Sequence, residues 1–135
     1  LKAHQEAGIT VSPDLHIPVQ LSNERAYEAM REQLTQGLKF DAVIAASDVI
    51  AMSAIRALKE FGCNVPEDVA VVGYDNIPLA PYVDPPLTTI SQDTHEAAKL
   101  LLECLFKKLG GEETPSAVIP AELIIRSSSV VATKT

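Results

Sequence analysis

Short polar side chains follow two apolar segments of this sequence, and their types and spacing suit them to bind a small molecule. Ser47 and Asp48 come directly after the apolar run 42–46, and Asp75 and Asn76 follow soon after the run 69–73. In an open parallel α/β sheet, ligands bind beyond the carboxyl ends of the strands. If both runs are neighbouring strands, these carboxylate, hydroxyl and amide groups share one rim, where they can bind hydroxyls or amides.

Both pairs also have a purely structural interpretation, and the residue types alone leave it open. Ser47 or Asp48 suits the N-cap of a helix, where a side-chain oxygen accepts a backbone N–H. Asp75 and Asn76 are residue types that favour turns. The ligand-binding interpretation depends on both pairs occurring at the same predicted edge of the sheet.

Catalytic and metal-binding alternatives have less support. The histidines His4, His16 and His95 have no Ser, Cys or metal-ligand neighbour at motif spacing. Cys63 and Cys104 form no CxxC pair, and we expect both thiols to behave as small apolar groups. We therefore predict that the chain is not an enzyme and holds no metal and no cofactor.

Helices and strands alternate in the order that positions such a rim. The runs 42–46 and 69–73 are uninterrupted and of strand length, which is typical of strands buried on both faces of a parallel sheet. Helical periodicity predicts one helix over 22–36 and another over 47–61, each followed by a glycine. A further short strand is expected around 16–20.

The pattern changes after Asp75. Four prolines lie between 76 and 93, and because proline removes a backbone donor, we expect at most short edge strands there, with Thr89 and Ile90 as one candidate. A long amphipathic helix follows over 94–109, and a final strand is expected within 117–129. This alternation predicts an α/β fold with parallel strands as the default.

Composition indicates one folded domain and excludes a nucleic-acid surface built on net charge. The 135 residues carry a formal charge of −7, and 47% of them are hydrophobic. Binding to phosphates needs clustered Lys and Arg. The longest uncharged apolar stretch, 42–47, is far shorter than the roughly 20 residues that span a bilayer, so no membrane contact is expected.

Three motifs occur in order along the chain. They read SD..A..A.RAL.E.G..VPEDVAVVGYD, then PPLTTI.QD, then IPAELIIRSS. With these motifs, the sequence from about 41 to 128 resembles the lactose-repressor and galactose-repressor family of bacterial transcription regulators. The resemblance implies a type I periplasmic-binding-protein-like fold, in which two open parallel α/β subdomains hold a small-molecule effector between them.

The resemblance also implies that residues 1–135 form a partial effector-binding domain, made of the C-terminal subdomain and a crossover helix near 94–109. The first subdomain and the DNA-binding headpiece are expected to be absent, because the resemblance covers only the second half of the effector-binding domain. The crossover helix would then lack its natural sheet. We expect its apolar stripe to be exposed, over Ala97, Ala98, Leu101, Leu102, Leu105, Phe106 and Leu109.

Individual roles follow from the resemblance by position. Asp75 matches the family aspartate that binds effector hydroxyls or amides. Ser47 matches a position that lines the same cleft, with Asp48 beside it. Thr94 falls where some members place an aromatic ring over the effector, and a threonine there argues against a flat purine. The effector-binding residues predicted in this way are Ser47, Asp48, Asp75 and Thr94.

A dimerisation surface is carried over in the same way, and we expect a homodimer through it. Its predicted residues are Val49, Met52, Ser53, Arg56, Leu79, Tyr82 and Val83. One of them departs from the family pattern, because Ser53 stands where glycine is common.

Two functions fit this resemblance. The first is the effector-sensing part of a cytoplasmic repressor, which binds a sugar or related metabolite and so changes operator affinity; operator DNA would be contacted only by the missing headpiece. The second is half of a periplasmic sugar-binding protein that serves a transporter. The fold alone does not decide between them. The three motifs favour the repressor, and a small α/β enzyme lacks a nucleophile, base and metal set.

Overall fold

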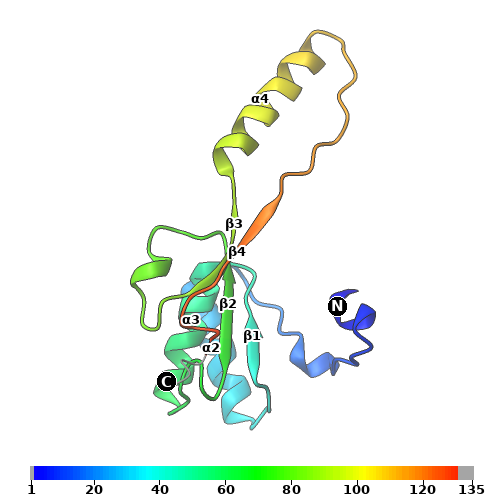
Figure 1. The fold of residues 1–135 in the computed structure, drawn as a ribbon. Helices are drawn as coiled ribbons and strands as arrows, with labels where there is room; N and C mark the ends of the chain where they lie inside the picture. The colour runs from blue at the N-terminus through cyan, green and yellow to red at the C-terminus, as the bar shows by residue number, and fades with distance from the viewer. Residues whose placement is uncertain (1, 131–135) are drawn as a thin grey trace.

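The computed structural model describes residues 2–130, which build a four-stranded sheet with helices beside and beyond it (Figure 1). The elements in chain order are α1 (Lys2–Glu6), the 3-10 helix η1 (Pro13–Leu15), α2 (Asn23–Thr35), β1 (Ala42–Ile44), α3 (Asp48–Glu60), β2 (Ala70–Tyr74), the 3-10 helix η2 (Ala80–Tyr82), β3 (Thr88–Gln92), α4 (Thr94–Leu109) and β4 (Ala121–Ile124).

The sheet has the order β1-β2-β3-β4, with the first three strands parallel and β4 antiparallel to β3. The α/β fold is thus confirmed, whereas the parallel default does not extend to β4. A parallel strand needs a crossover that carries the chain back to the other end of the sheet. Here the chain leaves β3 through α4 and returns from that same end, so it enters β4 in the opposite direction (Figure 1).

The hydrophobic core lies between the sheet and the pair α2 and α3, which Figure 1 shows together on one side. Leu58 of α3 and Val71 of β2 are fully buried there. The opposite face is open, because Ile44 of β1 is 76% exposed. The prediction of burial on both faces is therefore wrong for β1: the helices within residues 2–130 that pack on the sheet cover only one of its faces.

Two predicted strands differ from the structure. Residues 16–20 form no strand, because within residues 2–130 no neighbouring strand pairs with them and Pro18 offers no backbone donor. Conversely, Thr89 and Ile90 belong to a five-residue strand, β3, which lies between β2 and β4 rather than at an edge. The four prolines all precede β3, so its own backbone donors are intact.

The helix α4 stands apart from the core, at the end of a stalk formed by β3 and β4 (Figure 1). It contains no buried residue. Exposed fractions of 51% to 75% are found for Leu101, Leu102, Leu105, Phe106 and Leu109. The expected exposure of this apolar stripe is confirmed.

Candidate functional site

The carboxyl ends of β1 and β2 meet at one edge of the sheet, as predicted. The parallel register pairs Ile44 with Val72, and Ser47 and Asp75 each lie three positions further along the chain. We call Ser47, Asp48, Asp75 and Asn76 the carboxyl rim. The structure thus brings together the polar residues that follow the two apolar runs.

Asp48 lies behind the rim rather than on its surface, because it is fully buried. Its Oδ2 accepts a hydrogen bond from the backbone N–H of Ile77 at 2.8 Å, and its Oδ1 accepts one from the Thr89 hydroxyl at 2.5 Å. As the first residue of α3, its carboxylate also lies at the favourable end of the helix dipole. Both oxygens are therefore engaged by the chain itself, and Asp48 fixes the turn after β2.

Gly73 makes this placement of Asp48 sterically possible. A Cβ atom at position 73 would lie 2.2 Å from Asp48 Oδ1 and 3.2 Å from its Cα. A Cβ atom this close would force the buried Asp48 carboxylate to shift away from its hydrogen-bond donors. The glycine is therefore required by the close approach of α3 to β2, and not by a positive φ.

Asp75 is the exposed carboxylate of the rim, and its backbone is strained. Its φ is 110° and that of Asn76 is 51°, a region that side chains other than glycine rarely adopt. Hydrogen bonds within residues 2–130 engage Asn76 and Ile77, but none uses the Asp75 carboxylate. Strained residues of this kind occur at binding sites, where the surrounding structure enforces them. The arrangement presents a free, oriented acceptor to solvent.

Ser47 and Thr94 differ in burial, since Ser47 is buried and Thr94 is exposed. Ser47 is buried and caps α3, with its Oγ accepting from the Ile50 N–H at 3.4 Å, so its structural interpretation as an N-cap is confirmed. Thr94 is exposed at the start of α4. It follows Ile90, which bonds the Asp75 amide, by four residues, about 13 Å along an extended chain. Thr94 therefore lies beyond the rim.

Several residues of the site were not identified from the sequence. Ile77 and Thr89 bind Asp48, and Arg126 binds the side chain of Asn76 at 2.9 Å. Thr89 and Arg126 lie within the motifs that carried the family resemblance, which was the only available signal. Nothing in their spacing indicates contact with the rim.

The residues of the predicted dimer surface do not all lie on the surface. Tyr82 is 83% exposed and Leu79 and Val49 are also exposed, whereas Ser53 is buried and donates to the carbonyl of Val49 at 3.1 Å. An apolar depression of about 290 Å³ lies among them. Its lining residues are Met52, Ile55, Arg56, Lys59, Glu60, Val83 and Asp84.

A charged cluster borders this depression. Arg56 Nε donates to Glu60 Oε1 at 2.9 Å, and the guanidinium carbon lies 4.7 Å from the centre of the Tyr27 ring. The Tyr27 hydroxyl also donates to Glu60, and this bond, followed by that from Arg56, lowers the pKa of the Glu60 carboxyl. The same bond raises the pKa of Tyr27.

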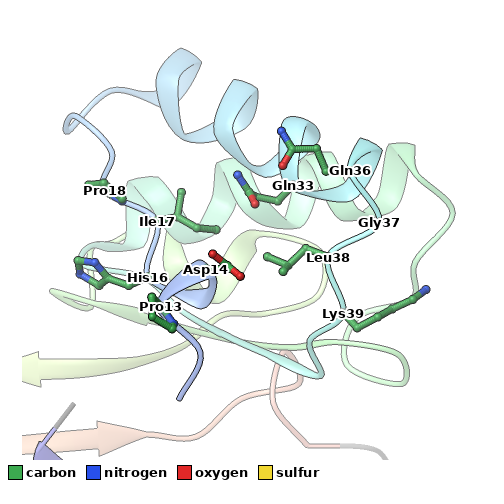
Figure 2. Close-up of a pocket in the computed structure, with 10 residues that line it drawn as sticks. All are labelled: Pro13, Asp14, His16, Ile17, Pro18, Gln33, Gln36, Gly37, Leu38 and Lys39. Atoms are coloured by element: carbon green, nitrogen blue, oxygen red, sulfur yellow. The ribbon is translucent and has the colours of Figure 1, made fainter. Parts of the chain in front are cut away.

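A second cavity lies at the other end of the sheet. It measures about 630 Å³ and lies between η1, the end of α2 and the chain that enters β1. Figure 2 shows Gln33, Leu38 and Asp14 beside it, with the Lys39 side chain extending away from the other residues. None of the predicted effector-binding residues lines this cavity.

The described residues also bear on metal and membrane binding. Among residues 2–130, no group of three or more His, Cys, Asp or Glu side chains is arranged to hold a metal ion. Within the same range, no helix is both long and apolar enough to cross a bilayer.

Known proteins resemble this chain over nearly its whole length. A family model described as a periplasmic binding protein-like domain matches residues 1–129. The chain belongs to the periplasmic binding protein-like domain family. Within this family, its motifs resemble regulators: it is 38% identical to the HTH-type transcriptional repressor PurR of Pasteurella multocida over 130 residues, which cover 95% of this chain and 39% of the relative.

Solved structures of transcriptional regulators have the same fold as this periplasmic binding protein-like domain. The transcriptional regulator CelR in complex with cellobiose superposes with a TM-score of 0.86 at 35% identity, covering 95% of this chain and 40% of that one. The lac repressor dimer bound to operator gives a TM-score of 0.85 at 26% identity, covering 96% and 45%. The resemblance to the lactose-repressor and galactose-repressor family is thereby confirmed, and these relatives are regulators rather than enzymes.

Proposed function

We propose that this chain is the effector-binding half of a cytoplasmic transcription regulator and that its carboxyl rim holds a small polyhydroxylated molecule. The chain spans about two fifths of the length of the curated relatives that it matches, 39% for PurR. The remaining parts of the parent protein would supply the other wall of the site and the contact with operator DNA. The solved CelR complex, which contains cellobiose, supports a saccharide as the first ligand class to test.

The observation that carries this proposal is the free Asp75 carboxylate. It is exposed at the predicted ligand edge, held in a strained backbone conformation, and unused by the described chain. A carboxylate binds hydroxyl groups through charge-assisted hydrogen bonds, which are stronger than neutral ones. Asp48 would act indirectly, by fixing the turn that carries Asp75. Ser47 would line the buried side of the ligand site. Thr94 would contact the part of the ligand that extends toward α4.

The domain arrangement belongs to the same proposal. The open face of the sheet at Ile44 and the exposed stripe of α4 are apolar surfaces of a kind that soluble proteins bury. We infer that the remainder of the parent protein covers both. In that arrangement β3 and β4 connect the half described here with the rest of the domain, and the ligand lies between the two parts.

Dimerisation through α3 and η2 is the partner interaction that we propose. Leu79 and Tyr82 are exposed at the N-cap and the end of η2, and Val83, which follows η2, lines the apolar depression together with Met52. The lac repressor was solved as a dimer bound to operator, which supports this expectation for the parent protein. In such a dimer the depression would be filled by the second copy.

The proposal is tested by screening the parent protein against saccharides, starting with cellobiose, and against nucleobases in a thermal unfolding assay. We expect a saccharide to raise the unfolding temperature because a ligand that binds only the folded state stabilises it. Heteronuclear NMR then maps the site, with shifts expected at Asp75 and Asn76. Stabilisation accompanied by shifts only around the cavity near Gln33 would contradict the assignment.

A further inference from the structure

The side chain of Asn76 bridges two segments that are distant in sequence. Its Nδ2 donates to the Ser91 hydroxyl of β3 at 3.3 Å, and its Oδ1 accepts from Arg126 Nη2 at 2.9 Å. Arg126 comes two residues after the end of β4. Asn76 is part of the carboxyl rim, so the carboxamide beside Asp75 is linked to both β3 and the chain leaving β4.

Arg126 is held firmly enough to serve as one end of this link. Its Nη1 donates to the carbonyl of Leu87 at 2.7 Å, and its backbone N–H donates to the Thr88 hydroxyl at 2.8 Å. No salt bridge involves Arg126 within residues 2–130, so this half-buried guanidinium bonds neutral oxygens only. The guanidinium group is planar and rigid, so the directions of its two N–H donors are fixed relative to each other.

The bridged strands lead away from the core. β3 and β4 pair over Thr89 to Gln92 and run together into the stalk that carries α4 (Figure 1). The Asp75 amide also donates to the Ile90 carbonyl of β3 at 2.9 Å. A movement of the turn that carries Asp75 would therefore be transmitted through its backbone to β3 and through Asn76 and Arg126 to the end of β4.

We propose that Asn76 and Arg126 are positioning residues, which together hold the Asp75 turn in its positive-φ conformation and couple it to the β3–β4 stalk. This inference rests on the proposed function only in treating the turn as a ligand site. The coupling itself needs no ligand. A ligand that fixes Asp75 would stabilise one orientation of the stalk, and hence of α4.

Amide hydrogen exchange of the 135-residue chain tests the coupling directly. We compare wild type with Asn76→Ala, Arg126→Met and the double variant. Arg126→Met is expected to speed exchange of the Ile77 amide about tenfold or more, the factor for loss of a charge-assisted hydrogen bond. Asn76→Ala is expected to speed exchange at Ile124 of β4, which pairs with Thr89 of β3, and the double variant should match the larger single effect.

Controls separate positioning from general destabilisation. The α3 amide of Leu58 should exchange as in wild type in every variant, and Glu122→Gln, an exposed change on β4, should alter nothing. Asn76→Asp retains the acceptor for Arg126, so the Ile124 amide should exchange as in wild type rather than as in Asn76→Ala. If Arg126→Met fails to fold, Arg126→Lys provides the same measurement. Lysine keeps the positive charge but lacks the planar guanidinium group that donates to two acceptors at once.

Each outcome of the exchange experiment supports or overturns the proposed coupling, and no ligand is needed for this. Selective acceleration in the partner segment supports the coupling even if no saccharide binds. The proposal is overturned if Arg126→Met leaves Ile77 exchange unchanged, if the two single effects add independently, or if all amides, including Leu58, accelerate equally. Failure of the saccharide screen would instead count against the proposed function alone.

Discussion

A Cβ atom at position 73 would lie 2.2 Å from Oδ1 of Asp48, so the absence of a side chain in β2 is what admits the buried carboxylate of α3. That carboxylate in turn holds the Ile77 amide and the Thr89 hydroxyl. The position of the Asp75 turn thus depends on a glycine and an aspartate that are not themselves exposed at the rim.

Replacing Gly73 by alanine should destabilise the fold by about 3 kcal/mol or more, because the new methyl group displaces the Asp48 carboxylate and leaves buried donors without partners. Urea unfolding measures the change. Gly110→Ala is the matched control: its Cβ would lie 3.3 Å from the Lys107 carbonyl, and we expect a change below about 1 kcal/mol. Equal effects of the two variants would show that the contact is unimportant.

Asp48→Asn tests the carboxylate itself with almost no change of volume. One of the two donors then faces an NH₂ group instead of an acceptor, so we expect a loss of about 2–3 kcal/mol of folding free energy. Asp93→Asn provides the control, since Asp93 caps α4 at an exposed position and asparagine caps equally well. Comparable urea midpoints for both variants would contradict the structural role given to Asp48.

Two apolar surfaces should drive association of the isolated chain, and they can be separated. In sedimentation experiments, Leu101→Glu with Leu105→Glu on α4 is expected to reduce larger assemblies to dimers. Adding Met52→Asp and Tyr82→Asp should then give monomers. A monomer already after the α4 changes would contradict the proposed dimer surface, and unchanged assemblies would show that α4 is not the cause.

The stability of the chain should depend on pH through Glu60. The folded state lowers the pKa of Glu60 below its ordinary value of 4.5, chiefly through the Tyr27 hydroxyl. The resulting stabilisation is therefore present above pH 4.5 and is lost as the pH falls through the folded-state pKa. Tyr27→Phe should show a smaller loss of stability than wild type between pH 6 and pH 3, whereas Tyr82→Phe should behave as wild type.

Sequence patterns predicted the parts of this fold that depend on local chemistry. Ser22 and Ser47 cap α2 and α3 where helical periodicity begins, and the two apolar runs became paired parallel strands. The meeting of the Ser47 and Asp75 segments at one edge also followed from these patterns, because parallel strands end at the same side of a sheet.

Other features could not be predicted because they depend on contacts between distant segments. Asp48 was expected to contact a ligand, but its burial depends on the missing side chain of Gly73 and on Thr89, 41 positions away. The direction of β4 depends on the end of the sheet from which the chain returns. A strand at 16–20 would need a partner that the described residues do not supply.

The most direct test of the central claim is the affinity of the parent protein and its Asp75→Ala variant for the saccharide found by screening, measured by calorimetry. The removed carboxylate should weaken binding about 10–100-fold, the loss expected for charge-assisted hydrogen bonds, while Asp14→Ala at the opposite end should bind as wild type. Unchanged affinity of Asp75→Ala, or a loss in Asp14→Ala instead, would contradict the assignment of the carboxyl rim as the ligand site.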